Sequence, residues 1–574
     1  KSDEEMNDLW RKRVKNDWLR LKLAGKDDKS IVDTLGKRYD NSLNSISKVK
    51  SDDVFQRFMS AYAMAIDPHT DYLGMRASED FDISMKLSLV GIGAVLQDKD
   101  EYTTIRELVA GGPAALSGKL KVGDRIVGVG QGENTPTTDV MGWRIDDTVA
   151  LIRGTENTTV RLDVLPAEAG PDGKHQLISL VRKKISLDKQ AAKKTIIEVK
   201  DGSETRHIGV ISLPGFYQDF SARQKGDKDY KSATRDVSRL LEELKKDKVD
   251  SVLIDLRNNG GGSLDEAIEL TGLFIGKGPV VQQRDSKGLV TVESDTNTGL
   301  AWNGPLGVLI NRGSASASEI FAAAIQDYGR GVVVGETSFG KGTVQSVVNL
   351  DQLMKNEKPK FGELKMTIAQ FFRINGGTTQ LRGVTPDISL PTMTDEEDFG
   401  ESSYDNALPW TQIKAADYTR AGDLTGIVPR LIAKHDQRVA SDKDFQYLRE
   451  DIAEFNTRRK KNAISLNEAD RRKEREVQDA RVKLREKDTA PGVHVSVESR
   501  SAALQDDGLQ SSERNLDADL AIEKARTNAR DVLLDEAVHI LSDEVGLLKT
   551  NASLAVSVLP KFAQRSSLSP MTYH

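Results

Sequence analysis

The feature that most restricts the fold is an alternation of short apolar runs with amphipathic helical patterns between about residues 190 and 395. Four apolar runs end in glycine or asparagine: RHIGVISLPGF, DSVLIDLRNNGGGS, PLGVLINRG and GVVVGE. Between them lie the helical patterns VSRLLEELKK, LDEAIELTGLFI and SEIFAAAIQDYG. This βα order predicts an α/β core of parallel strands, with loops meeting at their C-terminal ends, where sites usually lie.

The regions before this core follow different patterns. Residues 1 to about 80 read as helices, with a second amphipathic run from Val54 to Ile66 and a stop at DPHTDYLG. From about Leu87, short strand-like runs alternate with turn signals, and Trp143 to Gly154 reads as the only clear helix there. Such a segment predicts a small, partly open barrel.

The C-terminal part changes character again. DEEDFGES reads as an acidic linker, and a long charge-rich helical run follows it. We therefore predict a multidomain α+β protein with four domains. They are a helical domain over 1–83, a small β domain over 84–185, the α/β core over 186–395 and a helical domain over 396–574.

Composition excludes several function classes. A formal net charge of −6 speaks against a nucleic-acid binder, and no window approaches the roughly 20 apolar residues that span a bilayer. The absence of cysteine excludes thiol catalysis and cysteine zinc sites. The chain begins at Lys1 rather than Met, so we expect that a leader or an upstream segment has been removed.

The most informative motif is SASASE, where Ser316 stands between a strand and a helix. Ser316 and Glu319 fit a capping box, which is a purely structural explanation of the pattern. The same position also suits catalysis, because the backbone N–H groups of a first helical turn favour negative charge near a hydroxyl.

A nucleophilic serine at neutral pH needs a base. His207 and His435 lie far away in sequence, in contexts that predict surface residues. Lys341 lies in GETSFGKGTVQ, directly after the strand that follows the serine helix. Adjacent parallel strands would bring the two loops together, and burial would lower the pKa of Lys341 enough for it to act as a base.

These motifs carry a resemblance. The stretch from GSASASE to FGKGTVQ, with DLRNNGGGS and RGVTPDI, resembles the C-terminal processing peptidase family, in its tail-specific protease branch. The resemblance covers nearly the whole chain and implies a ClpP/crotonase-like protease core. It implies that Ser316 is the nucleophile, Lys341 the general base and Gln345 the residue that orients the lysine.

The same resemblance implies further roles. The oxyanion hole would use the N–H groups of Ala317 and of Gly262, which we favour over Gly261. Asp327 recurs near the site in this family, and holding the local structure fits it at least as well as catalysis. His69 recurs without being catalytic, so we expect a structural role for it.

The small β domain resembles an inserted PDZ domain. Its carboxylate-binding loop would be Gly91, Ile92, Gly93 and Ala94, followed by the turns GGPA and VGDRI. Glycines let backbone N–H groups converge on a terminal carboxylate, while a peptide tail adds a strand beside the helix. The alternative for this loop alone is that the glycines merely relieve strain in a strand.

Two other functions compete. GETSFGK fits the first seven places of a phosphate-binding loop, but Gly342 replaces the required hydroxyl and a strand pattern follows. A catalytically silent PDZ scaffold is the second alternative, and it predicts loss of the serine or the lysine, both of which are present.

The family resemblance implies a serine endopeptidase that selects protein substrates by their apolar C-terminal tails. It also implies a Gram-negative bacterial periplasm, envelope-protein processing and degradation, and a lipoprotein adaptor as a possible partner. We expect no metal and no organic cofactor, no nucleic-acid partner and no membrane-spanning segment.

Overall fold

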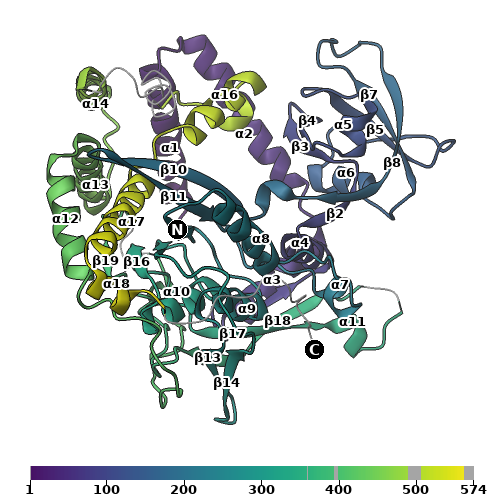
Figure 1. Ribbon diagram of the computed structural model, residues 1–574. Helices are drawn as coiled ribbons and strands as arrows, with labels where there is room; N and C mark the ends of the chain where they lie inside the picture. The colour runs from purple at the N-terminus through teal and green to yellow at the C-terminus, as the bar shows by residue number, and fades with distance from the viewer. Residues whose placement is uncertain (1, 358–359, 394–398, 489–505, 561–574) are drawn as a thin grey trace. The chain divides into compact units, whose positions relative to one another are not determined.

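The computed structural model of the chain describes residues 2–357, 360–393, 399–488 and 506–560 (Figure 1). The chain divides into two compact units. The first contains residues 1–51, 89–186 and 459–530, and the second contains residues 52–88, 187–458 and 531–574. No helix within the described ranges is both long enough and apolar enough to cross a membrane.

An antiparallel sheet forms the centre of the β part of the first unit. Its order is β3-β4-β5-β7-β8, with β6 paired to β5, so β3 is an edge strand. The strands are β3 (Ala94–Lys99), β4 (Tyr102–Leu108), β5 (Arg125–Gln131), β6 (Thr138–Asp139), β7 (Thr159–Leu165) and β8 (Gln176–Val181). Helices α5 (Pro113–Ser117) and α6 (Ile145–Ile152) accompany it, and β2 (Ser88–Gly91) pairs with β9 (Lys183–Ser186).

Helices make up the rest of the first unit. They are α1 (Asp3–Leu23), α2 (Asp28–Ser47), α14 (Glu468–Asp488) and α16 (Leu516–Thr527), with the short 3-10 helix η3 (Ser511–Glu513). Leu21, Ile31 and Leu35 bury their apolar side chains together between α1 and α2. The buried Arg38 of α2 donates to both carboxylate oxygens of Glu513, at 2.6 and 2.7 Å, which ties the distant C-terminal segment to the N-terminal helices.

The second unit is built around a six-stranded sheet with the order β10-β11-β12-β15-β16-β19. Every neighbouring pair from β11 to β19 is parallel, which confirms the predicted α/β core, while β10 and β11 form an antiparallel hairpin. The strands are β10 (Lys193–Asp201), β11 (Glu204–Ser212), β12 (Ser251–Asp255), β15 (Leu306–Ile310), β16 (Val332–Gly335) and β19 (Ile388–Ser389).

Helices cover both faces of this sheet, which explains why its central strands β12 and β15 are buried throughout. Val252 and Ile254 of β12 pack in one core cluster with α8 (Ala233–Lys246), α9 (Leu264–Ile275) and α10 (Ala317–Asp327). Leu253, on the opposite face, packs in a second cluster with α12 (Val428–Ser441), α17 (Val532–Thr550) and α18 (Ala552–Val558). Helix α17, drawn in yellow, runs along the sheet (Figure 1).

A second sheet has the order β1-β18-β13-β14, with β17 also paired to β18. Its strands are β1 (Asp71–Leu73), β13 (Gly278–Asp285), β14 (Val290–Asp295), β17 (Thr343–Asn349) and β18 (Glu363–Phe372). Strand β1 pairs with β18 through Asp71 and Lys365, so a segment from the N-terminal part of the chain completes this sheet.

The remaining helices of the second unit are short or peripheral: α3 (Ser51–Met64), α4 (Met75–Lys86), α7 (Phe220–Gln224), α11 (Leu350–Leu353), η1 (Asp188–Gln190) and η2 (Glu401–Ser403). The charge-rich run predicted as one long helix is instead interrupted, because α13 (Lys443–Lys461) ends before α14 begins at Glu468. Part of the predicted acidic linker, residues 394–398, lies outside the described residues. The four-domain division stays a prediction.

We expect Leu541→Ala in α17 to lower the free energy of unfolding by about 2–5 kcal/mol, because a buried leucine is replaced by a cavity. Leu541 is fully buried and packs against Gly307 of β15, whose missing side chain lets the helix approach the sheet. Urea unfolding followed by tryptophan fluorescence measures the change. The control is Val556→Ala in α18, where the valine is 62% exposed and the change should stay within about 0.5 kcal/mol.

Candidate active site

Ser316 lies in the turn between strand β15 and helix α10. It is the N-cap residue of α10 and Glu319 is its third residue, as the capping box predicts. The backbone of Ser316 has φ 57° and ψ −114°, a conformation that costs a non-glycine residue about 1–3 kcal/mol. An ordinary N-cap residue has an extended backbone, so the strained backbone of Ser316 is not explained by helix capping alone.

The three serines of SASAS differ in their surroundings. Ser314 and Ser318 are fully buried, and their hydroxyls donate to the carbonyl oxygens of Leu256 and Asn259, each at 2.8 Å. Ser316 is partly exposed. The outer serines therefore hold the turn in place, and the middle serine is the one that stays accessible to solvent.

Backbone N–H groups beside Ser316 are available as donors. Those of Ala317 and Gly262 have no hydrogen-bond acceptor among the described residues, whereas the Gly261 N–H donates to Asn259 Oδ1 at 2.9 Å. Gly261 packs on the turn of Ser316, since a Cβ there would lie 2.8 Å from the Cβ of Ser316. The geometry favours Gly262 over Gly261 as the second donor to an oxyanion.

The sheet register explains why the serine and lysine loops meet. Ile310 and Gly335 are partners at the ends of the parallel strands β15 and β16. Ser316 and Lys341 each lie six residues beyond these partners. The Phe339 N–H also donates to the Ser314 carbonyl at 3.0 Å, which joins the two loops directly.

Burial lowers the pKa of Lys341 to about 8, and the positive charge of Lys365 adds to this effect. The carboxylates of Glu401, Glu319 and Asp67 act in the opposite direction. Desolvation disfavours the ammonium form, so a substantial fraction of Lys341 is neutral near pH 8. A neutral amine is the form that can accept a proton from a hydroxyl.

Glu319 connects the two loops and is fully buried. One of its carboxylate oxygens accepts from the N–H groups of Ser316 and Lys341, at 2.8 and 2.9 Å. The other accepts from the Ser338 hydroxyl and the Gly340 N–H, at 2.6 and 2.7 Å. Burial raises the pKa of Glu319 to about 7, although all four hydrogen bonds oppose this shift. The sequence indicated only a helix cap at this position.

Gln345, which the family resemblance implies as the residue that orients the lysine, contacts Lys341. The Lys341 Nζ donates to Gln345 Oε1 at 2.6 Å. Ser316 Oγ and Lys341 Nζ are not hydrogen-bonded to each other among the described atoms. Their loops are joined through Glu319 and through the register of β15 and β16.

Asp327 is not part of this group. It is the last residue of α10, and a helix of this length separates its end from Ser316 by about 16 Å. Its carboxylate accepts from Arg373 at 2.6 and 3.1 Å and from Asn375 at 2.9 Å. Of the two roles that the sequence left open for Asp327, these bonds favour holding the local structure.

The histidines do not reach the serine through any hydrogen bond of the described residues. The His207 side chain is 42% exposed, as predicted. The prediction that His435 lies at the surface is wrong, because it is buried and its Nδ1 lies 2.7 Å from Glu536 Oε1. The charged helix around His435 hid this contact, since its partner comes from a helix 101 residues later. His69 Nε2 lies 2.6 Å from Glu401 Oε2.

The GETSFGKG loop does not have the form of a phosphate-binding loop. Such a loop opens a helix, whose N-terminal N–H groups bind the phosphates. Here strand β17 follows Gly342, as the sequence predicted. The geometry disfavours the nucleotide-enzyme alternative.

The loop from Gly91 to Ala94 lies at the start of the edge strand β3. The carbonyls of Ile92 and Gly93 accept from Ala114 and Val109, at 2.8 and 2.9 Å, so these bonds fix the loop. Gly93 has φ 73° and lies against Gly112, where a Cβ would lie only 3.0 Å from the Gly112 Cα. The unpaired edge of β3 can accept an added peptide strand.

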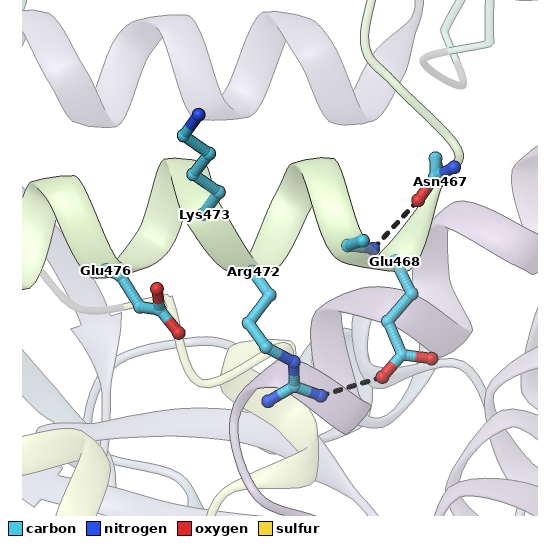
Figure 2. A pocket seen from close by; sticks show the side chains of 6 residues that line it. Asn467, Glu468, Arg472, Lys473 and Glu476 are labelled. Carbon is cyan, nitrogen blue, oxygen red and sulfur yellow. Dashed lines mark hydrogen bonds and ion pairs between the residues drawn. The ribbon is translucent and has the colours of Figure 1, made fainter.

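Elsewhere, the residues offer little ligand chemistry. No group of three or more acidic, histidine or cysteine side chains suited to a metal occurs among the described residues. A surface hollow along α14 is lined by charged side chains, but Arg472 pairs with Glu468 at 2.7 Å and Lys473 points to the other side of the helix (Figure 2). These side chains do not converge on a common point.

Comparisons with known families match successive parts of the chain. Residues 1–76 match the tail specific protease N-terminal domain, and residues 80–165 match the PDZ domain. Residues 207–390 match Peptidase family S41, and residues 394–546 match the C-terminal domain of tail specific protease.

Individual relatives agree with these matches. The chain is 42% identical over 483 residues to the tail-specific protease of Haemophilus influenzae, covering 84% of this chain and 66% of the relative. It is 28% identical over 326 residues to the carboxy-terminal processing protease CtpA of Bacillus subtilis, covering 56% of this chain and 60% of the relative. The chain thus spans less than two thirds of the length of each.

Solved structures with similarity include the photosystem II D1 C-terminal processing protease, at 25% identity and a TM-score of 0.33, over 62% of this chain and 88% of that one. Another is the PDZ domain of a carboxy-terminal protease from Vibrio cholerae in complex with peptide. It is 58% identical, with a TM-score of 0.17, over 18% of this chain and all of that one.

We expect Glu319→Gln to lower the free energy of unfolding by about 1–3 kcal/mol, because an amide NH₂ group replaces one acceptor oxygen and leaves buried donors unsatisfied. Urea unfolding measures the change. The matched control is Glu242→Gln on the exposed side of α8, which should change stability by less than about 0.5 kcal/mol. Equal effects of the two substitutions would contradict the connecting role of Glu319.

Proposed function

The chain belongs to Peptidase family S41, in its tail-specific protease branch, and on this premise we propose that it is a serine endopeptidase with Ser316 as nucleophile and Lys341 as general base. One observation carries the proposal: buried Glu319 accepts from the backbone N–H groups of both residues, and so joins a strained, accessible serine to a lysine of lowered pKa.

The reaction follows from these positions. Neutral Lys341 takes the proton of the Ser316 hydroxyl as Oγ attacks the carbonyl carbon of the scissile peptide bond. The N–H groups of Ala317 and Gly262 stabilise the negative oxygen of the tetrahedral intermediate. Protonated Lys341 then gives its proton to the leaving amine, and the ester forms on Ser316.

Hydrolysis of the ester completes the cycle. Lys341 accepts a proton from an attacking water molecule, the acid product leaves, and Ser316 Oγ regains its proton from the lysine. In this scheme Gln345 orients the lysine, and Asp327 maintains the structure at the far end of α10. No metal or organic cofactor takes part in the proposed steps.

Substrate selection is assigned to the PDZ domain. The N–H groups of the loop from Gly91 to Ala94 would bind the terminal carboxylate of an apolar tail, and the tail would add a strand to the free edge of β3. The substrates would be proteins with apolar C-termini. By family membership we further propose a periplasmic location in a Gram-negative bacterium, a role in envelope-protein processing and degradation, and a lipoprotein adaptor as a possible partner.

A catalytically silent scaffold is the competing function. A scaffold requires neither a reactive serine nor a neutral lysine. It would also give no reason for the strained backbone at Ser316. The contact of partly buried Lys341 with Gln345 favours the enzyme, because burying a charged amine costs stability while a neutral amine with one acceptor fits this position.

We expect Ser316→Ala and Lys341→Ala each to reduce cleavage of an unfolded reporter by at least about a thousandfold. The reporter carries either an apolar or a charged C-terminal tail, and only the apolar-tailed form should be cleaved rapidly. Ser286→Ala and Lys287→Ala, at exposed positions between β13 and β14, are the matched controls. Equal cleavage of both reporters would contradict tail selection, and no cleavage by the parent protein would favour the scaffold.

We expect kcat/KM to rise with pH and to reach half of its plateau near pH 8, because only neutral Lys341 acts as a base and burial lowers its pKa to about 8. Steady-state cleavage between about pH 6 and 10 measures this dependence. Lys341→Arg should be inactive throughout, since arginine stays charged. A flat profile for the parent protein would exclude Lys341 as the base.

A further inference from the structure

A continuous chain of hydrogen bonds leads from Lys341 to a carboxylate outside the predicted protease core. Lys341 Nζ donates to Gln345 Oε1 at 2.6 Å, and Gln345 Nε2 donates to Thr367 Oγ1 at 3.1 Å. Thr367 Oγ1 in turn donates to Asp67 Oδ1 at 2.8 Å. All four residues lie in the second unit of the chain.

The carboxylate of Asp67 fixes the direction of every hydrogen bond between it and Lys341. An ionised carboxylate only accepts hydrogen bonds, so the Thr367 hydroxyl must direct its proton to Asp67. The Thr367 oxygen is then an acceptor, and the amide of Gln345 must turn its NH₂ group toward it. Thr343 Oγ1 also accepts from Gln345 Nε2, at 2.9 Å. Gln345 Oε1 is therefore left facing Lys341.

This orientation decides whether the lysine can act as a base. Neutral Lys341 has two N–H bonds and one lone pair, and Gln345 Oε1 accepts one of the N–H bonds. The lone pair stays available for the Ser316 proton. If the amide were reversed, its NH₂ group would donate to that lone pair and block it.

Asp67 is itself held firmly. It accepts from the His69 N–H at 3.0 Å and from the Thr70 hydroxyl, and Thr70 Oγ1 accepts from the Thr367 N–H at 3.2 Å. Burial alone would raise the pKa of Asp67, but the hydrogen bonds from Thr70, His69 and Thr367 outweigh it and lower the pKa. Asp67 therefore remains an acceptor at neutral pH. Strand β1 follows directly and pairs with β18, which carries Thr367.

We propose that Asp67 and Thr367 are positioning residues for the catalytic lysine, acting through Gln345 without touching the substrate. This inference deepens the proposed function and rests on it. It makes the N-terminal segment with DPHT part of the catalytic apparatus, although the sequence indicated only a structural role there.

Asp67 also acts on Lys341 through its charge. The charged groups facing Lys341 are Lys365 of β18, Glu401 of η2, Glu319 of α10 and Asp67. His69 is the titratable group beside Asp67. The negative charge of Asp67 favours the ammonium form, so its removal lowers the pKa of Lys341 while the other groups stay in place.

The first test compares Thr367→Val with Thr367→Ser in cleavage of the apolar-tailed reporter. Valine keeps the shape but can neither accept from Gln345 nor donate to Asp67. We expect kcat to fall by about 10–100-fold with KM changed by less than about twofold, and serine to restore most of the activity. Thr291→Val on exposed strand β14 is the matched control. A kcat within about twofold of the parent value in Thr367→Val would overturn the proposal.

The second test uses Asp67→Asn and reads Lys341 directly. Labelling of Lys341 with acetic anhydride at a series of pH values, followed by peptide mass spectrometry, reports its titration without any turnover. In the Ser316→Ala background, Asp67→Asn should move this titration to lower pH, whereas Asp229→Asn, at a side chain 95% exposed, should leave it in place. In the enzyme with Ser316 intact, the pH profile of kcat/KM should move in the same direction.

The two tests separate the inference from the proposed function. A parent protein that cleaves neither reporter contradicts the proposed protease, and the labelling experiment still decides whether Asp67 acts on Lys341. An unchanged titration of Lys341 in Asp67→Asn overturns the electrostatic link. A purely structural role for Asp67 and Thr367 would lower thermal stability while leaving both the titration and the kcat of the folded fraction unchanged.

Discussion

The site depends on one buried carboxylate. Glu319 accepts four hydrogen bonds from the two loops that carry Ser316 and Lys341. A buried acceptor of this kind has no water to replace its donors, so moving either loop would leave polar groups unsatisfied. The strained backbone of Ser316 is kept in place by the same constraint, together with the buried hydroxyls of Ser314 and Ser318.

The pKa of Lys341 results from opposing effects. Burial and Lys365 favour its neutral form, while three carboxylates favour the charged one, and burial prevails so that its pKa falls to about 8. Those carboxylates come from different parts of the chain: Asp67 precedes the PDZ domain, Glu319 opens α10, and Glu401 follows the protease core. The electrostatics of one amine therefore link segments that the sequence assigns to three domains.

The hydrogen bonds that lead from Asp67 to Lys341 orient the lysine, in addition to the effects on its pKa. A charge sets the pKa of a base, but only oriented donors and acceptors decide where its lone pair points. Gln345 supplies the orientation, and it depends on Thr367 of the neighbouring strand β18. The pairing of β1 with β18 places Asp67 within reach of Thr367, so the second sheet acts as the support of the proposed base.

The sequence by itself determined the α/β core, the turn at Ser316 and the loop of Lys341, because each depends on local patterns and on the order of parallel strands. The role of Gln345 came from the family resemblance alone. Only the tertiary structure decided that Glu319 joins the loops, that Asp327 lies apart, that His435 is buried and that Asp67 is linked to Gln345 through Thr367. These relations depend on contacts between residues far apart in the chain. Hydrophobic periodicity records which face of an element is buried, but not which polar partner will meet it there.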